Sequence, residues 1–202
     1  MQQFLIFDDF YREPLDVRKF ALSCSYDKSK HTPWPGLVSQ TPWSGTREAL
    51  EKIARLVSTE SPDWQLIVDQ HNFWGEGTCG QFRVMYDGQG LQPRPHAHFD
   101  GQWTGLIGLS LPHDVRGGTV FYRHRRTNTV SSQQLERGLY RDLIERDGGK
   151  DDAWEPIGKA ETGFNRLVVF DSRQFHSFTS GFGHCLDNCR LMQIFDFTIP
   201  AH

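Results

Sequence analysis

Residues 95–101 read Pro-His-Ala-His-Phe-Asp-Gly, so two histidines and one aspartate occur within seven positions. In a β-strand, side chains two positions apart point to the same face of the sheet. His98 and Asp100 would therefore reach one point in space, where an imidazole and a carboxylate can share a metal ion. His96 is the alternative to His98, but only His98 is followed by an aspartate at this spacing.

A further histidine follows a compact apolar run much later in the chain. Residues 167–170 are Leu-Val-Val-Phe, which is typical of a buried strand, and His176 comes shortly afterwards. His184 is a second candidate, but it lies between glycine and a polar, cysteine-bearing stretch. Two histidines and one carboxylate on one side of a metal leave the opposite positions open, as in non-haem Fe(II) oxygenases. The sequence predicts that His98, Asp100 and His176 bind the metal and form the catalytic centre.

Three other stretches fit the same kind of site. Residues 117–122 read Gly-Gly-Thr-Val-Phe-Tyr, a glycine turn entering a strand, and residues 163–170 read as a turn followed by a buried strand. The last strand is expected at residues 190–197, where alternate side chains form one mainly apolar face and one more polar face. If the apolar face packs under helices, Arg190 turns toward a central cavity. Its planar guanidinium can bind a carboxylate through two parallel hydrogen bonds.

In the order of these stretches the chain resembles the Fe(II)- and 2-oxoglutarate-dependent dioxygenases, and within them the prolyl 4-hydroxylase-like branch. The order is a tyrosine- and glycine-containing segment at residues 86–90, then His-x-Asp, the paired glycines, the apolar strand, the second histidine and a basic residue. The resemblance covers roughly residues 80–200. It implies that His98, Asp100 and His176 bind Fe(II), that Arg190 binds the distal carboxylate of the cosubstrate 2-oxoglutarate, and that Tyr86 hydrogen-bonds to this cosubstrate.

Many short strands interrupted by glycine and proline predict a mainly β fold, a double-stranded β-helix (a cupin-like jelly roll) with flanking helices. We expect a single domain over residues 1–202. Its helical N-terminal support would occupy about residues 1–62, and its jelly-roll core about residues 63–200.

Helical spacing of apolar residues predicts two N-terminal helices that cover one outer face of a sheet. The first spans residues 9–24, and the second begins at Thr46. Residues 31–45, which contain Trp34 and Trp43, are expected to be a loop, and strand-like sequence resumes at Trp64. A helical insert is predicted from a capping box, Ser131 to Gln134, followed by Leu135, Leu139 and Leu143 at every fourth position.

The composition excludes several classes of partner. The formal net charge of −3 and the pI of about 6.3 give no electrostatic footprint for nucleic acid or an anionic membrane. No apolar run approaches the length of a transmembrane helix, and residues 1–9 lack the features of a signal peptide. We therefore expect a cytoplasmic protein with four free thiols, a small-molecule or peptide substrate and a possible homodimer.

Three functions are consistent with these residues. The first is an oxygenase that hydroxylates an amino-acid, peptide or small-molecule substrate. The second is a metal-dependent hydrolase, because the same ligands can hold Zn(II) or Mn(II) and activate water. The third is a non-catalytic cupin-like binding protein. Arg190 favours the oxygenase, since it suits an organic diacid, but the sequence does not identify the substrate.

Overall fold

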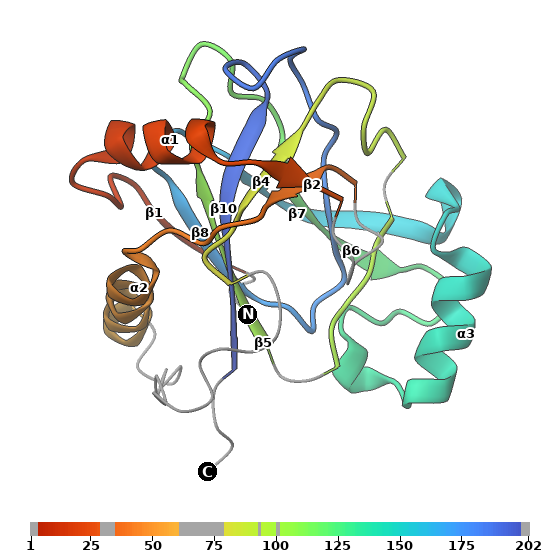
Figure 1. Ribbon diagram of the computed structural model, residues 1–202. Helices are drawn as coiled ribbons and strands as arrows, with labels where there is room; N and C mark the ends of the chain where they lie inside the picture. Colours follow the sequence, from red (N-terminus) through yellow and green to blue (C-terminus); the bar gives the residue numbers. More distant parts are fainter. Residues whose placement is uncertain (1–3, 29–34, 61–78, 93, 100–101, 199–202) are drawn as a thin grey trace.

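The structure is a computed structural model, and it describes residues 4–28, 35–60, 79–92, 94–99 and 102–198. These residues form two antiparallel sheets and three α-helices (Figure 1). The strands are β1 (Leu5–Phe7), β2 (Tyr26–Asp27), β3 (Leu37–Ser39), β4 (Phe82–Met85), β5 (Gln102–Gly108), β6 (Gly118–His124), β7 (Trp154–Glu161), β8 (Leu167–Asp171), β9 (His176–Phe178) and β10 (Arg190–Thr198). The helices are α1 (Pro14–Ser23), α2 (Thr46–Glu60) and α3 (Arg137–Asp147), with short 3-10 turns η1 (Ser132–Gln134) and η2 (Asp151–Ala153).

The larger sheet has the strand order β1-β8-β5-β10-β4-β3-β2, and the smaller sheet has the order β7-β6-β9. Consecutive neighbours in both sheets are antiparallel. A bridge between His96 and His176 adds the histidine-containing segment to the edge of the smaller sheet. Two facing antiparallel sheets with crossed connections form the double-stranded β-helix, so the predicted fold class is confirmed.

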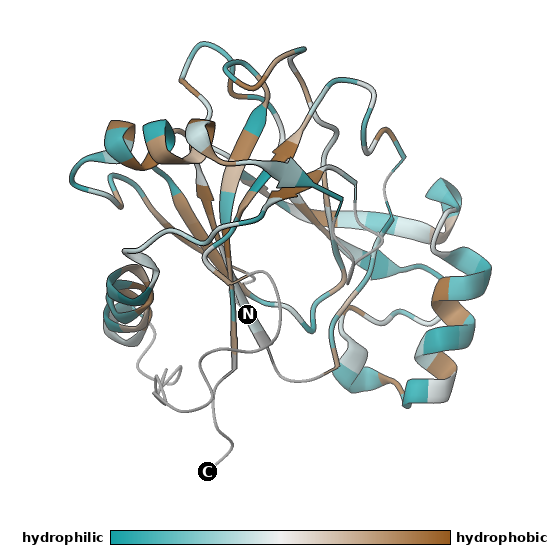
Figure 2. Ribbon diagram, viewed as in Figure 1, coloured by the Kyte–Doolittle hydropathy of each residue, from teal (hydrophilic) through white to brown (hydrophobic). Residues whose placement is uncertain are grey.

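Helices α1 and α2 cover the outer face of the larger sheet, as the sequence predicts. Ala21 of α1 and Leu50 and Ile53 of α2 pack in one buried cluster with Leu191 and Phe195 of β10. Removing a side chain of this size from water stabilises the fold by about 1.5–3 kcal/mol. Figure 2 shows many hydrophobic residues along the strands beside these helices.

The opposite face of the larger sheet points toward the smaller sheet. Met192 and Ile194 of β10 pack there with Phe170 of β8 and Phe121 of β6. Residues two apart on β10 therefore share a face, and the expected alternation along the last strand is confirmed. We call the side of the larger sheet that faces the smaller one its inner face.

The third helix begins later than predicted. The capping box is present, because Ser131 and Gln134 make both of its hydrogen bonds, but it caps η1 rather than α3. Leu135 is extended, and α3 starts at Arg137. The predicted apolar stripe is therefore wrong: Leu139 is 58% exposed, whereas Leu143 is buried beside Trp154.

Other boundaries also differ from the predictions. Helix α1 begins at Pro14 rather than at residue 9, because proline is favoured in the first turn of a helix and disfavoured inside it. Helix α2 begins at Thr46, as predicted. The predicted loop 31–45 contains strand β3, while Trp34 and Trp64 lie outside the described residues. Within those residues, no helix has both the length and the apolar character needed to cross a membrane.

Candidate metal centre

Three histidines meet at one edge of the smaller sheet. His96 and His176 form a reciprocal backbone pair, in which each amide N donates to the other's carbonyl oxygen at 3.0 and 2.9 Å. The amide of His98 donates to the carbonyl of Ser172 at 2.8 Å. This pairing holds two segments that are far apart in the sequence in a fixed register, so the histidine side chains are positioned by backbone hydrogen bonds.

The three imidazoles are close enough to share one ion. One ring nitrogen of each lies within 4.8 Å of a ring nitrogen of the other two. The ring centroids of His96 and His176 are 4.3 Å apart, and both are 5.6 Å from that of His98. Metal–nitrogen bonds of about 2.0–2.1 Å place neighbouring ligand atoms about 3.0–3.4 Å apart, so a small inward movement completes a site.

Backbone carbonyls set the tautomer of two of these rings. Nδ1 of His176 lies 2.7 Å from the carbonyl oxygen of Gln174, and Nδ1 of His96 lies 3.2 Å from that of Arg94. A carbonyl oxygen can only accept, so Nδ1 carries the hydrogen and donates it in both rings. Nε2 then carries the lone pair that a metal needs, and the hydrogen bond at Nδ1 orients the ring.

Burial keeps His96 and His176 neutral. It lowers the pKa of His176 to about 3, with a further contribution from repulsion by His98. Burial also lowers the pKa of His96 well below its usual value, and repulsion by His176 and His98 adds to the effect. Neutral imidazole is the form that binds a metal. The donor set therefore fits a divalent transition metal such as iron, nickel or zinc.

The structure brings together two of the three predicted ligands. His98 and His176 converge, and the third member of the observed cluster is His96, whereas Asp100 lies outside the described residues. His184 is exposed on the loop before β10, where its amide bonds to Asn188 at 2.8 Å. The metal assignment of Asp100 thus stays a prediction, and His96 enters as a further ligand candidate.

Arg190 lies at the start of β10 with 1% of its surface exposed. Its Nη1 donates to the carbonyl oxygen and the hydroxyl of Thr179 at 2.7 and 2.8 Å, and its Nη2 donates to the carbonyl of Gly118 at 2.9 Å. Burial lowers its pKa to about 10, so the side chain stays cationic at neutral pH. Tyr86 packs against the helix-side cluster of the larger sheet. The cosubstrate roles of both residues stay predictions.

One buried residue was missed by the sequence reasoning. Arg83 is the second residue of β4 and is 3% exposed, and its Nε and Nη1 have no hydrogen-bond partner within the described part of the chain. The signal was present in the sequence. Residues 82–85 read Phe-Arg-Val-Met, which places one cation inside an otherwise apolar strand.

A cavity of about 540 Å³ opens beside the histidines. Its lining includes His96, Ser177 and Phe178, together with Pro35, Leu91 and Arg94. This volume is within the range of pockets that bind small molecules. A ligand in the cavity would therefore contact the cluster through His96.

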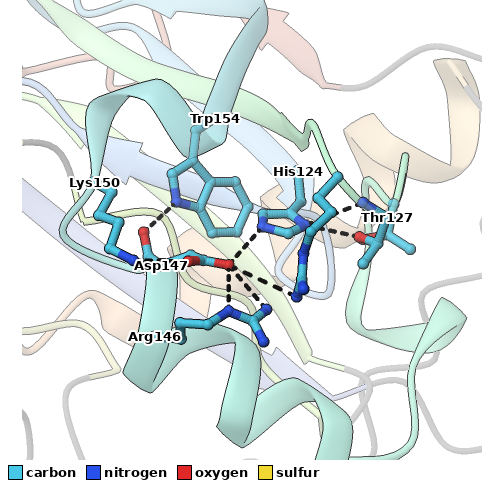
Figure 3. Close-up of polar contacts among 8 residues, drawn as sticks. His124, Thr127, Arg146, Asp147, Lys150 and Trp154 are labelled. Atoms are coloured by element: carbon cyan, nitrogen blue, oxygen red, sulfur yellow. Dashed lines mark hydrogen bonds and ion pairs between the residues drawn. The ribbon is translucent and has the colours of Figure 1, made fainter.

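A second buried histidine belongs to a different kind of site (Figure 3). His124 places Nδ1 2.8 Å from the hydroxyl of Thr127 and Nε2 3.1 Å from Oδ2 of Asp147. Asp147 also accepts from Arg146 at 2.9 Å and from Lys150 at 3.3 Å. Burial acts to raise the pKa of Asp147, but these hydrogen bonds outweigh it and the pKa is lowered. Both nitrogens of His124 are therefore occupied within the protein.

Comparisons with known proteins agree with the fold. The model of a family described as "Family of unknown function (DUF6445)" matches residues 89–179, which include all three clustered histidines. No curated protein matches the sequence.

Solved structures share the architecture. AviO1 from Streptomyces viridochromogenes Tue57 is 13% identical, with a TM-score of 0.54 over 98% of this chain and 90% of that one. SnoN, a non-heme alpha ketoglutarate dependent epimerase from nogalamycin biosynthesis, is 12% identical, with a TM-score of 0.52 over 95% of this chain and 76% of that one.

HygX from Streptomyces hygroscopicus, with nickel, 2-oxoglutarate and hygromycin B bound, is 13% identical. Its TM-score is 0.50, over 98% of this chain and 85% of that one. These likenesses show the fold, which is the double-stranded β-helix of 2-oxoglutarate oxygenases. Fold and site together define a jelly-roll protein with a buried histidine cluster that fits a metal ion.

Proposed function

We propose that the protein is a non-haem Fe(II)- and 2-oxoglutarate-dependent oxygenase, of the prolyl 4-hydroxylase-like branch, that hydroxylates an amino-acid, peptide or small-molecule substrate. The observation that carries the proposal is the cluster of His96, His98 and His176 beside a cavity in a jelly-roll fold. SnoN is alpha ketoglutarate dependent and HygX binds 2-oxoglutarate, and both likenesses support the choice of cosubstrate.

In this proposal His98 and His176 hold the iron, and the third ligand is Asp100 or His96. Asp100 would complete the two-histidine, one-carboxylate set. His96 has the geometric support, since it is paired with His176 through the backbone and oriented by the carbonyl of Arg94. Bound iron would supply the dioxygen chemistry that side chains lack.

The protein's own residues would orient the ligands and keep water away. Phe170 packs edge-on against the His176 ring, with the centroids 4.7 Å apart, and so shields one side of the imidazole. Arg190 would bind the distal carboxylate of 2-oxoglutarate, and Tyr86 would donate a hydrogen bond to the same cosubstrate. The cavity beside His96 would receive the substrate.

The test is a reaction with purified protein, Fe(II), 2-oxoglutarate and dioxygen. We expect succinate to form and dioxygen to be consumed, slowly when no substrate is added. Replacing Fe(II) with Zn(II) should stop both, because zinc has no accessible redox change. Absence of succinate with iron-loaded protein, across a broad set of amino acids and peptides, would contradict the proposal.

A metal-dependent hydrolase is the second candidate, and the third imidazole favours it. Three histidines are the ligand set of some catalytic zinc sites, in which bound water loses a proton near neutral pH. A hydrolase would keep its activity with Zn(II) in the absence of dioxygen. The same metal exchange therefore separates the two functions.

A further inference from the structure

The cavity beside the histidines combines an apolar wall with one cation. Pro35, Leu91 and Phe178 supply apolar surface, and Arg94 lines the cavity together with the buried His96. Among the described lining residues, Arg94 alone carries a permanent charge and none is an aspartate or a glutamate. Small-molecule pockets are mostly apolar, with a few polar groups that fix the orientation of the ligand. Arg94 therefore gives this cavity a preference for an anion.

The backbone of Arg94 is held by other residues of the same cavity. Its amide donates to Oγ of Ser177 at 3.2 Å, and its carbonyl oxygen accepts from Nδ1 of His96 at 3.2 Å. The hydroxyl of Ser177 in turn donates to the carbonyl oxygen of Phe178 at 3.2 Å. These hydrogen bonds engage the backbone of Arg94 and the serine hydroxyl within the protein. The guanidinium is therefore the part of Arg94 that is available to an occupant.

The guanidinium of Arg94 makes no hydrogen bond or ion pair with another residue in the described part of the chain. Two other arginines show what such a group binds. Nε and Nη2 of Arg166 donate to the two carboxylate oxygens of Asp8 at 2.6 and 3.1 Å, and Arg173 is paired with Asp171 through the same two nitrogens. A planar guanidinium matches a carboxylate in this geometry. Arg94 offers the same fork beside the cavity, without an acidic side chain of the described chain to occupy it.

We infer that the primary substrate is an organic acid, whose carboxylate binds to Arg94 and whose apolar portion lies along Leu91 and Phe178. Leu91 is 69% exposed, so an apolar ligand would remove its side chain from water. This inference rests on the proposed function, because it assigns the occupant of the substrate cavity. The cosubstrate 2-oxoglutarate is the rival source of a carboxylate, but the apolar wall suits a less polar molecule, and Arg190 is already proposed to bind 2-oxoglutarate.

The experiment compares hexanoate with hexanamide, which has a similar shape and no charge. Both are titrated calorimetrically into the full-length protein in chelator, so that coordination to a metal cannot account for binding. We expect hexanoate to bind about tenfold or more tightly than hexanamide, because hydrogen bonds between charged groups are stronger than neutral ones. Acetate should bind more weakly than hexanoate, by up to about fourfold for each methylene buried. A wild type that does not prefer hexanoate to hexanamide would overturn the inference.

Variants of Arg94 locate the preference. Arg94→Gln should lose the preference for hexanoate and keep the affinity for hexanamide, and Arg94→Lys should retain part of the preference because it keeps the charge but not the fork. The matched control is Arg55→Gln, which changes an exposed arginine of α2 and should bind both ligands as the wild type does. A folded Arg94→Gln protein with an undiminished preference would refute the role of Arg94. The wild-type comparison tests the substrate class without any variant.

A further titration separates the substrate from the cosubstrate. The protein is loaded with Zn(II), which cannot turn over, and saturated with 2-oxoglutarate before hexanoate is added. We expect hexanoate still to bind, and Arg94→Gln to bind 2-oxoglutarate as the wild type does. Loss of hexanoate binding, together with weaker binding of 2-oxoglutarate by Arg94→Gln, would assign Arg94 to the cosubstrate and contradict the inference.

Failure of this inference can be told from failure of the proposed function. If the iron-loaded wild type forms succinate but does not prefer hexanoate to hexanamide, the oxygenase proposal stands and the substrate class is wrong. If the preference is present and depends on Arg94, but the protein neither binds 2-oxoglutarate nor forms succinate, the carboxylate site stands and the oxygenase proposal fails.

Discussion

The two buried histidine sites of this protein differ in the groups that surround the imidazole rings. At the site of His124, both ring nitrogens have partners, and the carboxylate of Asp147 is surrounded by basic side chains. In the cluster of His96, His98 and His176, three imidazoles converge, and burial lowers the pKa of His96 and of His176.

This difference separates a structural site from a functional one. A polar network whose members satisfy one another stabilises and orients the chain. Three imidazoles whose ring nitrogens converge on one point instead indicate a bound metal ion. Four predictions test this distinction, and they run from the largest expected effect to the smallest.

His176→Ala should remove metal binding. The variant loses an oriented imidazole whose Nδ1 is fixed by the carbonyl of Gln174, so we expect the affinity for Fe(II) or Zn(II) to fall at least about a hundredfold. Metal content after dialysis and calorimetric titration measure this. The matched control is His184→Ala on the exposed loop, which should bind metal as the wild type does. Equal metal binding by both variants would contradict the site.

The third ligand can be found by comparing His96→Ala with Asp100→Asn. His96 lies in the described cluster and its ring is oriented by the carbonyl of Arg94, so we expect His96→Ala to weaken metal binding about tenfold or more; a larger loss in His96→Ala than in Asp100→Asn makes His96 the third ligand. The same calorimetric titration gives both values. The reverse order would establish the two-histidine, one-carboxylate set that the sequence predicts.

His124→Ala should destabilise the protein without affecting the metal site. The change removes a fully buried ring and leaves the hydroxyl of Thr127 and the carboxylate of Asp147 short of a partner. We expect the free energy of unfolding to fall by about 2–4 kcal/mol, measured by urea denaturation, with unchanged metal affinity. A stable variant that loses metal would reverse the roles of the two sites.

The metal-free protein should lose stability as the pH falls. The pKa of His176 is lowered to about 3 in the folded state, from about 6.5 when unfolded, so below pH 6.5 the unfolded state binds the extra proton. The contribution of this residue is complete above pH 6.5 and declines toward pH 3, by at most about 1.4 kcal/mol per pH unit. Urea denaturation in chelator between pH 7 and 5 measures the slope, and His176→Gln should make it shallower.

The sequence contained enough to predict the fold and part of the site. Alternation along residues 190–197 placed Arg190 and Met192 on the inner face, and helical spacing placed α2 correctly from Thr46. His98 and His176, two of the predicted ligands, lie in one cluster, whereas the two-residue spacing was used to pair His98 with Asp100, which lies outside the described residues. These features depend on periodicity, which is a local property of the chain.

The predictions that were wrong or missing concern features that are set by contacts between distant residues. The start of α3 is set by the extended Leu135 and by packing of Leu143 on Trp154, which no local pattern specifies. His96 enters the cluster because its backbone pairs with His176, eighty residues later in the chain.

The most direct test of the central claim is succinate formation by three proteins under identical conditions with Fe(II), 2-oxoglutarate and dioxygen: the wild type, His176→Ala and His124→Gln. We predict that the wild type and His124→Gln form succinate at similar rates per folded molecule, and that His176→Ala forms none above the protein-free background. Succinate formation by His176→Ala at the wild-type rate, or none by iron-loaded wild type, would contradict the assignment of the histidine cluster as an oxygenase centre.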